Sequence, residues 1–235
     1  MNVALPTSTS NPSVATERLK LNIQTMSTSN SDLDMLLWRL RARIQCDSTA
    51  ATLIGLTSCS AKSGVTTLTT NLSVRAASNH MGPVLLIDAN IGAPRLHKIF
   101  KITPRSGLFD LLSGSGTPEE AIQPTAIESL DLMPVGSRES IRSGKIGPEN
   151  YSDIISWIRD RYRTVFIDLP TIDSMRHSLF LARMFDTTIV AVRSESVRRS
   201  DAAAAIRRMT DDGVNIGGTI LTRRRIYTPR WLRHA

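Results

Sequence analysis

The stretch from residue 52 to residue 72 reads Thr-Leu-Ile-Gly-Leu-Thr-Ser-Cys-Ser-Ala-Lys-Ser-Gly-Val-Thr-Thr-Leu-Thr-Thr-Asn-Leu. The apolar run 53–56 predicts a buried strand, and the small residues 58–64 predict a loop before a helix that begins near Thr66. When a strand, a small-residue loop and a helix N-terminus follow one another, converging N–H groups and the helix dipole favour a bound phosphate. We therefore expect a phosphate-binding loop, or P-loop, in this stretch.

The P-loop lysine is missing. The pattern ends in Gly-Lys-Ser/Thr, with the lysine reaching the β- and γ-phosphates, whereas this chain has Gly64-Val65-Thr66. Valine can neither carry charge nor donate a hydrogen bond, so binding loses roughly 1.5–3 kcal/mol. One lost transition-state donor slows a reaction by on the order of 100- to 1000-fold. We therefore expect weakened Mg-nucleotide binding and a larger loss of turnover.

The loop and the first helical turn are the expected phosphate site. Lys62 stands three residues before Val65 and is the candidate replacement cation, with a solvated loop lysine as the alternative. Thr66 retains the hydroxyl that such loops offer to Mg²⁺. The expected nucleotide-binding residues are Ser60, Ala61, Lys62, Ser63, Gly64, Val65, Thr66 and Thr67.

Two other apolar runs end in a carboxylate. Residues 84–88 and 164–168 predict central parallel strands that end at Asp88 and Asp168. Ligands of such sheets bind at the carboxyl ends of the strands. Both acids are therefore candidates for catalysis and, together with Thr66, for Mg²⁺ binding. The alternative is that each acid caps the loop or helix after its strand.

Alternating strands and helices predict an α/β fold, a doubly wound, mostly parallel sheet with helices on both faces, as in the three-layer, Rossmann-like P-loop NTPases. We expect this domain to span 51–222, after a disordered leader (1–30) and a helix with its linker (31–50), and before a basic tail (223–235). The expected helices cover 31–44, 66–79, 94–100, 107–112, 118–122, 151–162, 174–185 and 201–209. The expected strands cover 53–57, 82–88, 130–133, 164–168, 187–192 and 214–221, with a mobile loop over 137–148.

Composition narrows the class of protein. Of 235 residues, 41% are hydrophobic and 21% are charged, as in soluble globular proteins. No apolar run approaches the ~18–20 residues of a membrane span, and the first residues do not resemble a secretory signal. Two cysteines without ligand or disulfide spacing favour a reducing cytoplasm. The net charge of +8 is concentrated in the arginine-rich, acid-free tail, which suits an acidic lipid, nucleic acid or partner, or is simply solvated.

From Leu53 to about Leu221 the order of these pieces resembles the bacterial tyrosine kinase (BY-kinase) family, and more widely the deviant P-loop ATPases of the MinD and ParA type. The most specific stretch is Val-Leu-Leu-Ile-Asp-Ala-Asn (84–90) with Pro94, His97 and Phe100. It is similar to the family's strand ending in Asp-Ala-Asp, followed by Arg-Arg-Pro-x-x-His-x-x-Phe. Further similar blocks are 107–114, 133–136, 162–170, Asp186 and 189–193.

The departures from the family pattern fall mainly at positions where the family binds nucleotide or carries out catalysis. In this alignment the catalytic lysine position is Val65, and the signature lysine of the deviant P-loop would be at Ser60. The second acid, the two following arginines and the asparagine that reads adenine are replaced by Asn90, Gly92, Ala93 and Thr222. Of the family's Glu-x-x-Arg-x-x-Arg oligomer motif only Arg41 is kept, with Met35 and Trp38 at the other places, and the tyrosine-rich tail is reduced to Tyr227.

The resemblance implies a cytoplasmic module of capsule or exopolysaccharide biosynthesis or export, at the inner face of the plasma membrane. It implies ATP/ADP and Mg²⁺ as cofactors, a membrane-embedded polysaccharide co-polymerase or export protein as partner, and self-association. The lost side chains predict a regulatory pseudo-kinase.

Two alternatives stay open. One is an active protein-tyrosine kinase or ATPase with relocated catalytic groups, for which Tyr227 is the acceptor in the tail. The other is a MinD/ParA-like partition or positioning switch. The missing signature lysine and the Pro-x-x-His-x-x-Phe block disfavour the switch. A nucleic-acid partner is therefore not expected. The arginine-rich tail leaves open peripheral contact with a membrane, with a solvated tail as the alternative.

Overall fold

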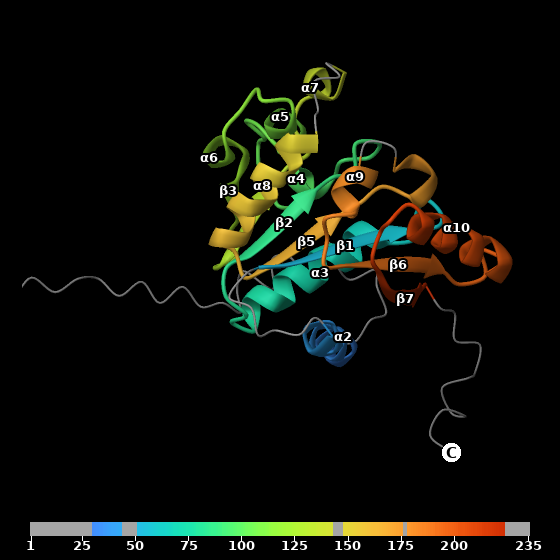
Figure 1. The fold of residues 1–235 in the computed structure, drawn as a ribbon. Helices are drawn as coiled ribbons and strands as arrows, with labels where there is room; N and C mark the ends of the chain where they lie inside the picture. Colours follow the sequence, from blue (N-terminus) through green and yellow to red (C-terminus); the bar gives the residue numbers. More distant parts are fainter. Residues whose placement is uncertain (1–29, 44–50, 143–147, 176–177, 224–235) are drawn as a thin grey trace, which may run out of the picture.

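The computed structural model describes residues 30–43, 51–142, 148–175 and 178–223 (Figure 1). Residues 1–29 of the predicted leader, the predicted linker after the first helix, and residues 224–235 of the basic tail, with Tyr227, lie outside these ranges. The strands are β1 (Thr52–Ser58), β2 (Val84–Asp88), β3 (Gln123–Pro124), β4 (Leu130–Met133), β5 (Thr164–Asp168), β6 (Thr187–Arg193) and β7 (Ile216–Thr222). They form one seven-stranded sheet in the order β3-β4-β2-β5-β1-β6-β7. Every neighbouring pair is parallel except β3 with β4.

Helices cover both faces of the sheet, which confirms the predicted fold class (Figure 1). The helices are α2 (Asn30–Arg43), α3 (Val65–Ser78), α4 (Leu96–Ile99), α5 (Leu108–Leu112), α6 (Pro118–Ala121), α7 (Arg138–Arg142), α8 (Pro148–Arg161), α9 (Leu179–Ala182) and α10 (Arg199–Asp211), with a 3₁₀ turn, η1 (Ile172–Ser174). None of the helices in the described ranges is long and apolar enough to cross a membrane.

Each central strand supplies side chains to two separate cores. In β1, Leu53 packs in the core that α5, α8 and α9 cover, whereas its neighbour Ile54 packs in the core that α2 and α3 cover. Successive strand residues point to opposite faces, and both faces are buried here. This explains why the central strands are almost continuously apolar.

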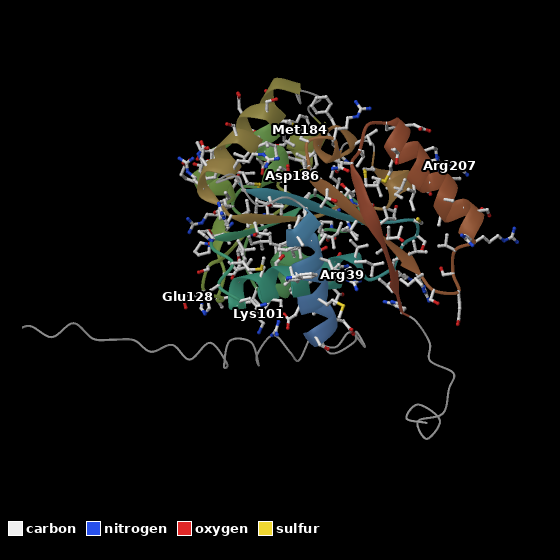
Figure 2. All side chains as sticks on the ribbon, turned by 60° about the horizontal axis from the view of Figure 1, so that its bottom comes forward. Arg39, Lys101, Glu128, Met184, Asp186 and Arg207 are labelled. Carbon is white, nitrogen blue, oxygen red and sulfur yellow. The ribbon has the colours of Figure 1, made fainter. Side chains whose placement is uncertain are left out.

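The N-terminal helix α2 packs beside α3, the helix that follows the P-loop (Figure 2). Its side chains Leu33, Leu37 and Leu40 recur at helical spacing and are buried. Asp34 adds a bidentate ion pair with Arg75 of α3, in which Nε and Nη2 donate to Oδ1 and Oδ2, each at 2.5 Å. The hydrogen bonds from Arg75 lower the pKa of the Asp34 carboxyl. Buried leucines and this ion pair together hold α2 against the rest of the domain.

Two local predictions were wrong, and one short strand was not predicted. The expected mobile loop 137–148 contains α7, because the Ser137 hydroxyl accepts the N–H of Ser140 and so caps its first turn. The expected helix 174–185 is shorter, with η1 before it and α9 as its helical part. The two-residue strand β3 gave no sequence signal, since it includes a proline and lies at the sheet edge.

Candidate functional site

The P-loop and both predicted carboxylates lie at the carboxyl edge of the sheet. Strand β5 lies between β1 and β2, so the strand that leads into the P-loop and the strand that ends in Asp88 both flank Asp168. Asp88 is directly opposite Asp168 in the parallel register. Just beyond, the N–H of Ala89 donates to the Asp168 carbonyl at 2.9 Å. The three segments are therefore adjacent, as the sequence predicted.

Asp168 is a buried acid in which only one of the two carboxylate oxygens accepts a hydrogen bond among the described residues. The Thr66 hydroxyl, in the first turn of α3, donates to Asp168 Oδ2 at 2.7 Å. Oδ1 is buried and has no hydrogen-bond partner in the part of the chain that the structure describes. Burial, followed by the charge of Asp88, raises the pKa of Asp168 well above its usual range, and the Thr66 bond only partly offsets this. Because a cation beside this oxygen would relieve both effects, Thr66 and Asp168 fit a hard metal such as Mg²⁺.

Asp88 is committed to its own loop. Its Oδ1 accepts the N–H of Asn90, and its Oδ2 accepts the N–H groups of Arg95 and Leu96, each at 3.1 Å. Burial raises the pKa of Asp88 to about 6 against the opposing effect of these hydrogen bonds. The structure therefore shows the capping role that the sequence left open as an alternative. A catalytic or metal-water role for Asp88 stays a prediction.

Side-chain hydroxyls hold the P-loop in shape. The hydroxyls of Ser58 and Ser63 both donate to the Ser60 carbonyl, at 2.9 and 2.6 Å. Gly64 precedes α3 with a φ of 84°, a left-handed conformation that glycine adopts without steric cost. The first N–H groups of α3 have no acceptor within the helix. The loop thus retains the backbone features of a phosphate site.

The lysine position does not offer a cation. Val65 is only 8% exposed and belongs to the apolar core between α3 and the sheet, together with Leu68 and Leu72. Lys62 is exposed, with a φ of 60°. Among the other predicted loop residues, Ala61 is exposed and Ser60 and Thr67 are half-buried.

The side chains that the structure describes form no metal-binding cluster of their own. Within the described ranges no group of three or more His, Cys, Asp or Glu side chains could hold a metal ion. Thr66 and Asp168 would hold Mg²⁺ together with the oxygens of a bound phosphate, and a contribution of Asp88 stays a prediction. Mg²⁺ commonly binds in this way, through one or two carboxylates and substrate phosphates.

Thr222 has a role that the sequence did not reveal. It occupies the position where the resemblance places an adenine-reading asparagine. Its hydroxyl instead donates to the Ser63 carbonyl at 2.7 Å. Since the partners are 159 residues apart, no local pattern could have shown this contact.

A polar cleft of about 1220 Å³ lies elsewhere, between β3 and the short helices α5 to α7. At its wall the buried Asp110 carboxylate accepts hydrogen bonds from the N–H groups of Gly107 and Ser137 and from the hydroxyls of Ser137 and Ser140. These bonds lower the pKa of Asp110 although burial acts in the opposite direction. The sequence gave no signal for this cluster beyond isolated serines.

Comparison with known proteins finds bacterial tyrosine kinases. No family model matches the chain. Tyrosine-protein kinase wzc of Salmonella typhi is 29% identical over 166 residues, which are 71% of this chain and 23% of wzc. CapB of Staphylococcus aureus, assigned to the same kinase class, is 25% identical over 168 residues, which are 72% of this chain and 73% of CapB. The chain spans about a quarter of the length of relatives of the wzc type.

Solved structures show the same fold. The kinase domain of the Escherichia coli tyrosine kinase ETK superposes with a TM-score of 0.74 at 20% identity, covering 85% of this chain and 78% of that domain. MinD of Pyrococcus horikoshii, complexed with Mg-ADP, superposes with a TM-score of 0.59 at 25% identity, covering 73% and 70%. These findings confirm the resemblance that was inferred from the sequence motifs.

Proposed function

We propose that this chain, a relative of the bacterial tyrosine-protein kinases with the P-loop fold that they share with MinD, is a regulatory pseudo-kinase module with a weakened Mg-nucleotide site. One observation carries the proposal. Val65, the residue at the lysine position, is packed in the apolar core. The next residue, Thr66, keeps its hydrogen bond to Asp168 at the end of β5.

A site that keeps Thr66 and Asp168 but lacks the lysine should retain phosphate binding better than phosphoryl transfer. Backbone N–H groups and a metal held by Thr66 and Asp168 would bind phosphate in the ground state. Phosphoryl transfer also needs positive charge where negative charge develops in the transition state. Val65 is buried and carries no charge, and Lys62 is exposed on the loop, which supports the proposal that turnover is lost. Nucleotide binding without efficient turnover suits a switch or scaffold.

The biological setting is proposed from the relatives. They are tyrosine-protein kinases, and one is encoded in a cps region. We assign this chain to capsule or exopolysaccharide biosynthesis or export at the cytoplasmic face of the membrane, with ATP or ADP and Mg²⁺ as ligands. Its partner would be a membrane-embedded polysaccharide co-polymerase or export protein. Self-association and contact of the basic tail with the membrane surface belong to the same proposal.

The test is a melting experiment on the purified chain with ADP or ATP, each with Mg²⁺ and with EDTA. A ligand that binds only the native state raises the melting temperature, so we expect a rise with Mg-nucleotide that is lost in Asp168→Asn. The matched control is Glu128→Gln. Glu128 is exposed and precedes β4, so it lies at the amino ends of the strands, opposite the candidate site, and this variant should keep the rise in melting temperature. No rise in the unmodified chain would contradict the nucleotide site.

Phosphate release is measured on the same samples, and we expect none above background. Release that Asp88→Ala abolishes would instead support the active enzyme with relocated groups. Mass spectrometry of Tyr227 would then separate a tyrosine kinase from an ATPase.

A further inference from the structure

Thr222, the last residue of β7, joins three segments behind the P-loop. Its hydroxyl donates to the Ser63 carbonyl at 2.7 Å, and its own carbonyl accepts the N–H of Ser194 at 3.0 Å. Thr222 and Ser63 are 4% and 1% exposed, so water does not compete for their bond. The loop after β1 is thus tied to the ends of β6 and β7.

This bond also sets the direction of a backbone donor. In a trans-planar peptide the C=O and the N–H point in opposite directions. Since the Ser63 carbonyl points at Thr222, the N–H of Gly64 points away from it. That N–H has no acceptor among the residues the structure describes. It is therefore available to an anion on the far side of the peptide.

The same device recurs one turn earlier in the loop. The Ser60 carbonyl is held by the hydroxyls of Ser58 and Ser63, so the following N–H, of Ala61, points the opposite way. Side-chain hydroxyls thus fix the direction of two carbonyls in this loop and, with them, of the N–H groups of Ala61 and Gly64.

The Ser63–Gly64 peptide needs such a restraint. Glycine populates both signs of φ readily, so rotation of this peptide meets little steric resistance. A rotated peptide would place a carbonyl oxygen against the phosphate and remove a donor. In a loop that lacks the lysine, each backbone donor carries a larger share of the binding.

We propose that Thr222 is a positioning residue for phosphate, acting through Ser63 and Gly64. Its hydroxyl holds the Ser63 carbonyl away from the anion and keeps the Gly64 N–H directed at it. This inference rests on the proposed nucleotide-binding function, and adds the residue that orients its loop.

The test compares Thr222→Val, which keeps the side-chain shape and removes the hydroxyl, with Thr222→Ser, which keeps the hydroxyl. The matched control is Thr125→Val. Thr125 follows β3, the outer strand on the side of the sheet opposite β7, and its hydroxyl donates a hydrogen bond of 2.8 Å to the Leu130 carbonyl. Each variant is titrated with Mg-ADP and with Mg-pyrophosphate, which has no base or ribose. Losing one hydrogen bond and its donor geometry should weaken both ligands about 10-fold in Thr222→Val.

We expect Thr222→Ser to bind within about 2-fold of the unmodified chain and Thr125→Val to bind unchanged. Hydrogen exchange of the ligand-free protein should be faster over residues 58–66 in Thr222→Val only. Unchanged binding of both ligands by Thr222→Val would overturn the role, and so would weaker ADP binding with unchanged pyrophosphate binding, which indicates a base contact. If the unmodified chain binds neither ligand, the proposed function itself fails. If Thr222→Val does not fold, Thr222→Ser carries the test together with Thr222→Ala, and equal affinities of these two overturn the role.

Discussion

The hydroxyl of Thr66 meets Oδ2 of Asp168 at 2.7 Å, although the two residues are 102 positions apart in the chain. The bond joins the first turn of α3 to the carboxyl end of β5 and leaves Asp168 Oδ1 buried without a partner in the described residues. Because only one oxygen of Asp168 accepts a hydrogen bond, a cation beside the other oxygen would stabilise the ionised carboxylate. The candidate site is organised around this asymmetry.

Asp168→Asn should remove the metal dependence of nucleotide binding. The amide can still accept the Thr66 hydrogen bond but cannot carry the charge that attracts Mg²⁺. We expect Mg²⁺ to strengthen ADP binding about 10-fold or more in the unmodified chain and to have no effect in the variant. Calorimetric titrations with Mg²⁺ and with EDTA measure both values. A variant that retains the Mg²⁺ effect would show that the metal binds elsewhere.

Val65→Lys should restore part of the lost affinity. A charged hydrogen bond to phosphate is worth roughly 1.5–3 kcal/mol, which corresponds to about 10- to 150-fold in Kd for Mg-ATP. Removing a buried valine should lower the free energy of unfolding by about 1 kcal/mol. Val65→Met is the control, because it has similar length without charge. Equal nucleotide affinities of the two variants would mean that the side chain at this position does not reach the phosphate.

Lys62 should prove dispensable for binding. It is exposed, and its φ of 60° is a conformation that alanine tolerates less well than glycine. We therefore expect Lys62→Gly to leave Mg-ADP affinity within about 2-fold and stability within about 0.5 kcal/mol. Lys62→Arg controls for retained charge. A loss of affinity in Lys62→Gly that Lys62→Arg reverses would identify Lys62 as the replacement cation.

Asp110 should make stability sensitive to acid. Its folded-state pKa lies below the reference value of 3.8. The stability it contributes is therefore present above pH 3.8 and is lost as pH falls through the folded pKa. Asp110→Ala leaves several buried donors unpaired and should cost about 3 kcal/mol at neutral pH. In urea unfolding, the difference from the unmodified chain should shrink at pH 3 and below.

Glu128→Gln, at an exposed carboxylate, is the control for that titration and should not change the pH profile. A difference for Asp110→Ala that is the same at pH 7 and pH 3 would mean that the carboxylate charge does not stabilise the serine cluster.

The sequence predicted the central sheet well, because its signals are local. Strands β4 and β5 have the predicted bounds, since each is a short, mostly apolar run with a proline at or shortly after its end. It also predicted that Asp88, Asp168 and the P-loop meet, because parallel strands bring their carboxyl ends to one edge. It missed α7 and predicted too long a helix around α9, because these short segments have little periodicity of their own. The α7 segment is fixed by a cap and by the contact of Ser137 with Asp110.

The order of residues alone determined the fold and the loss of the lysine, because periodicity and residue chemistry can be read without knowing any partner. The tertiary structure decided what the remaining polar groups do. Asp88 caps its own loop, and the Thr222 hydroxyl holds the Ser63 carbonyl. The physical reason is the winding of the sheet, which places β7 and the P-loop side by side although most of the chain separates them in sequence, and hydrogen bonds depend on distance in space.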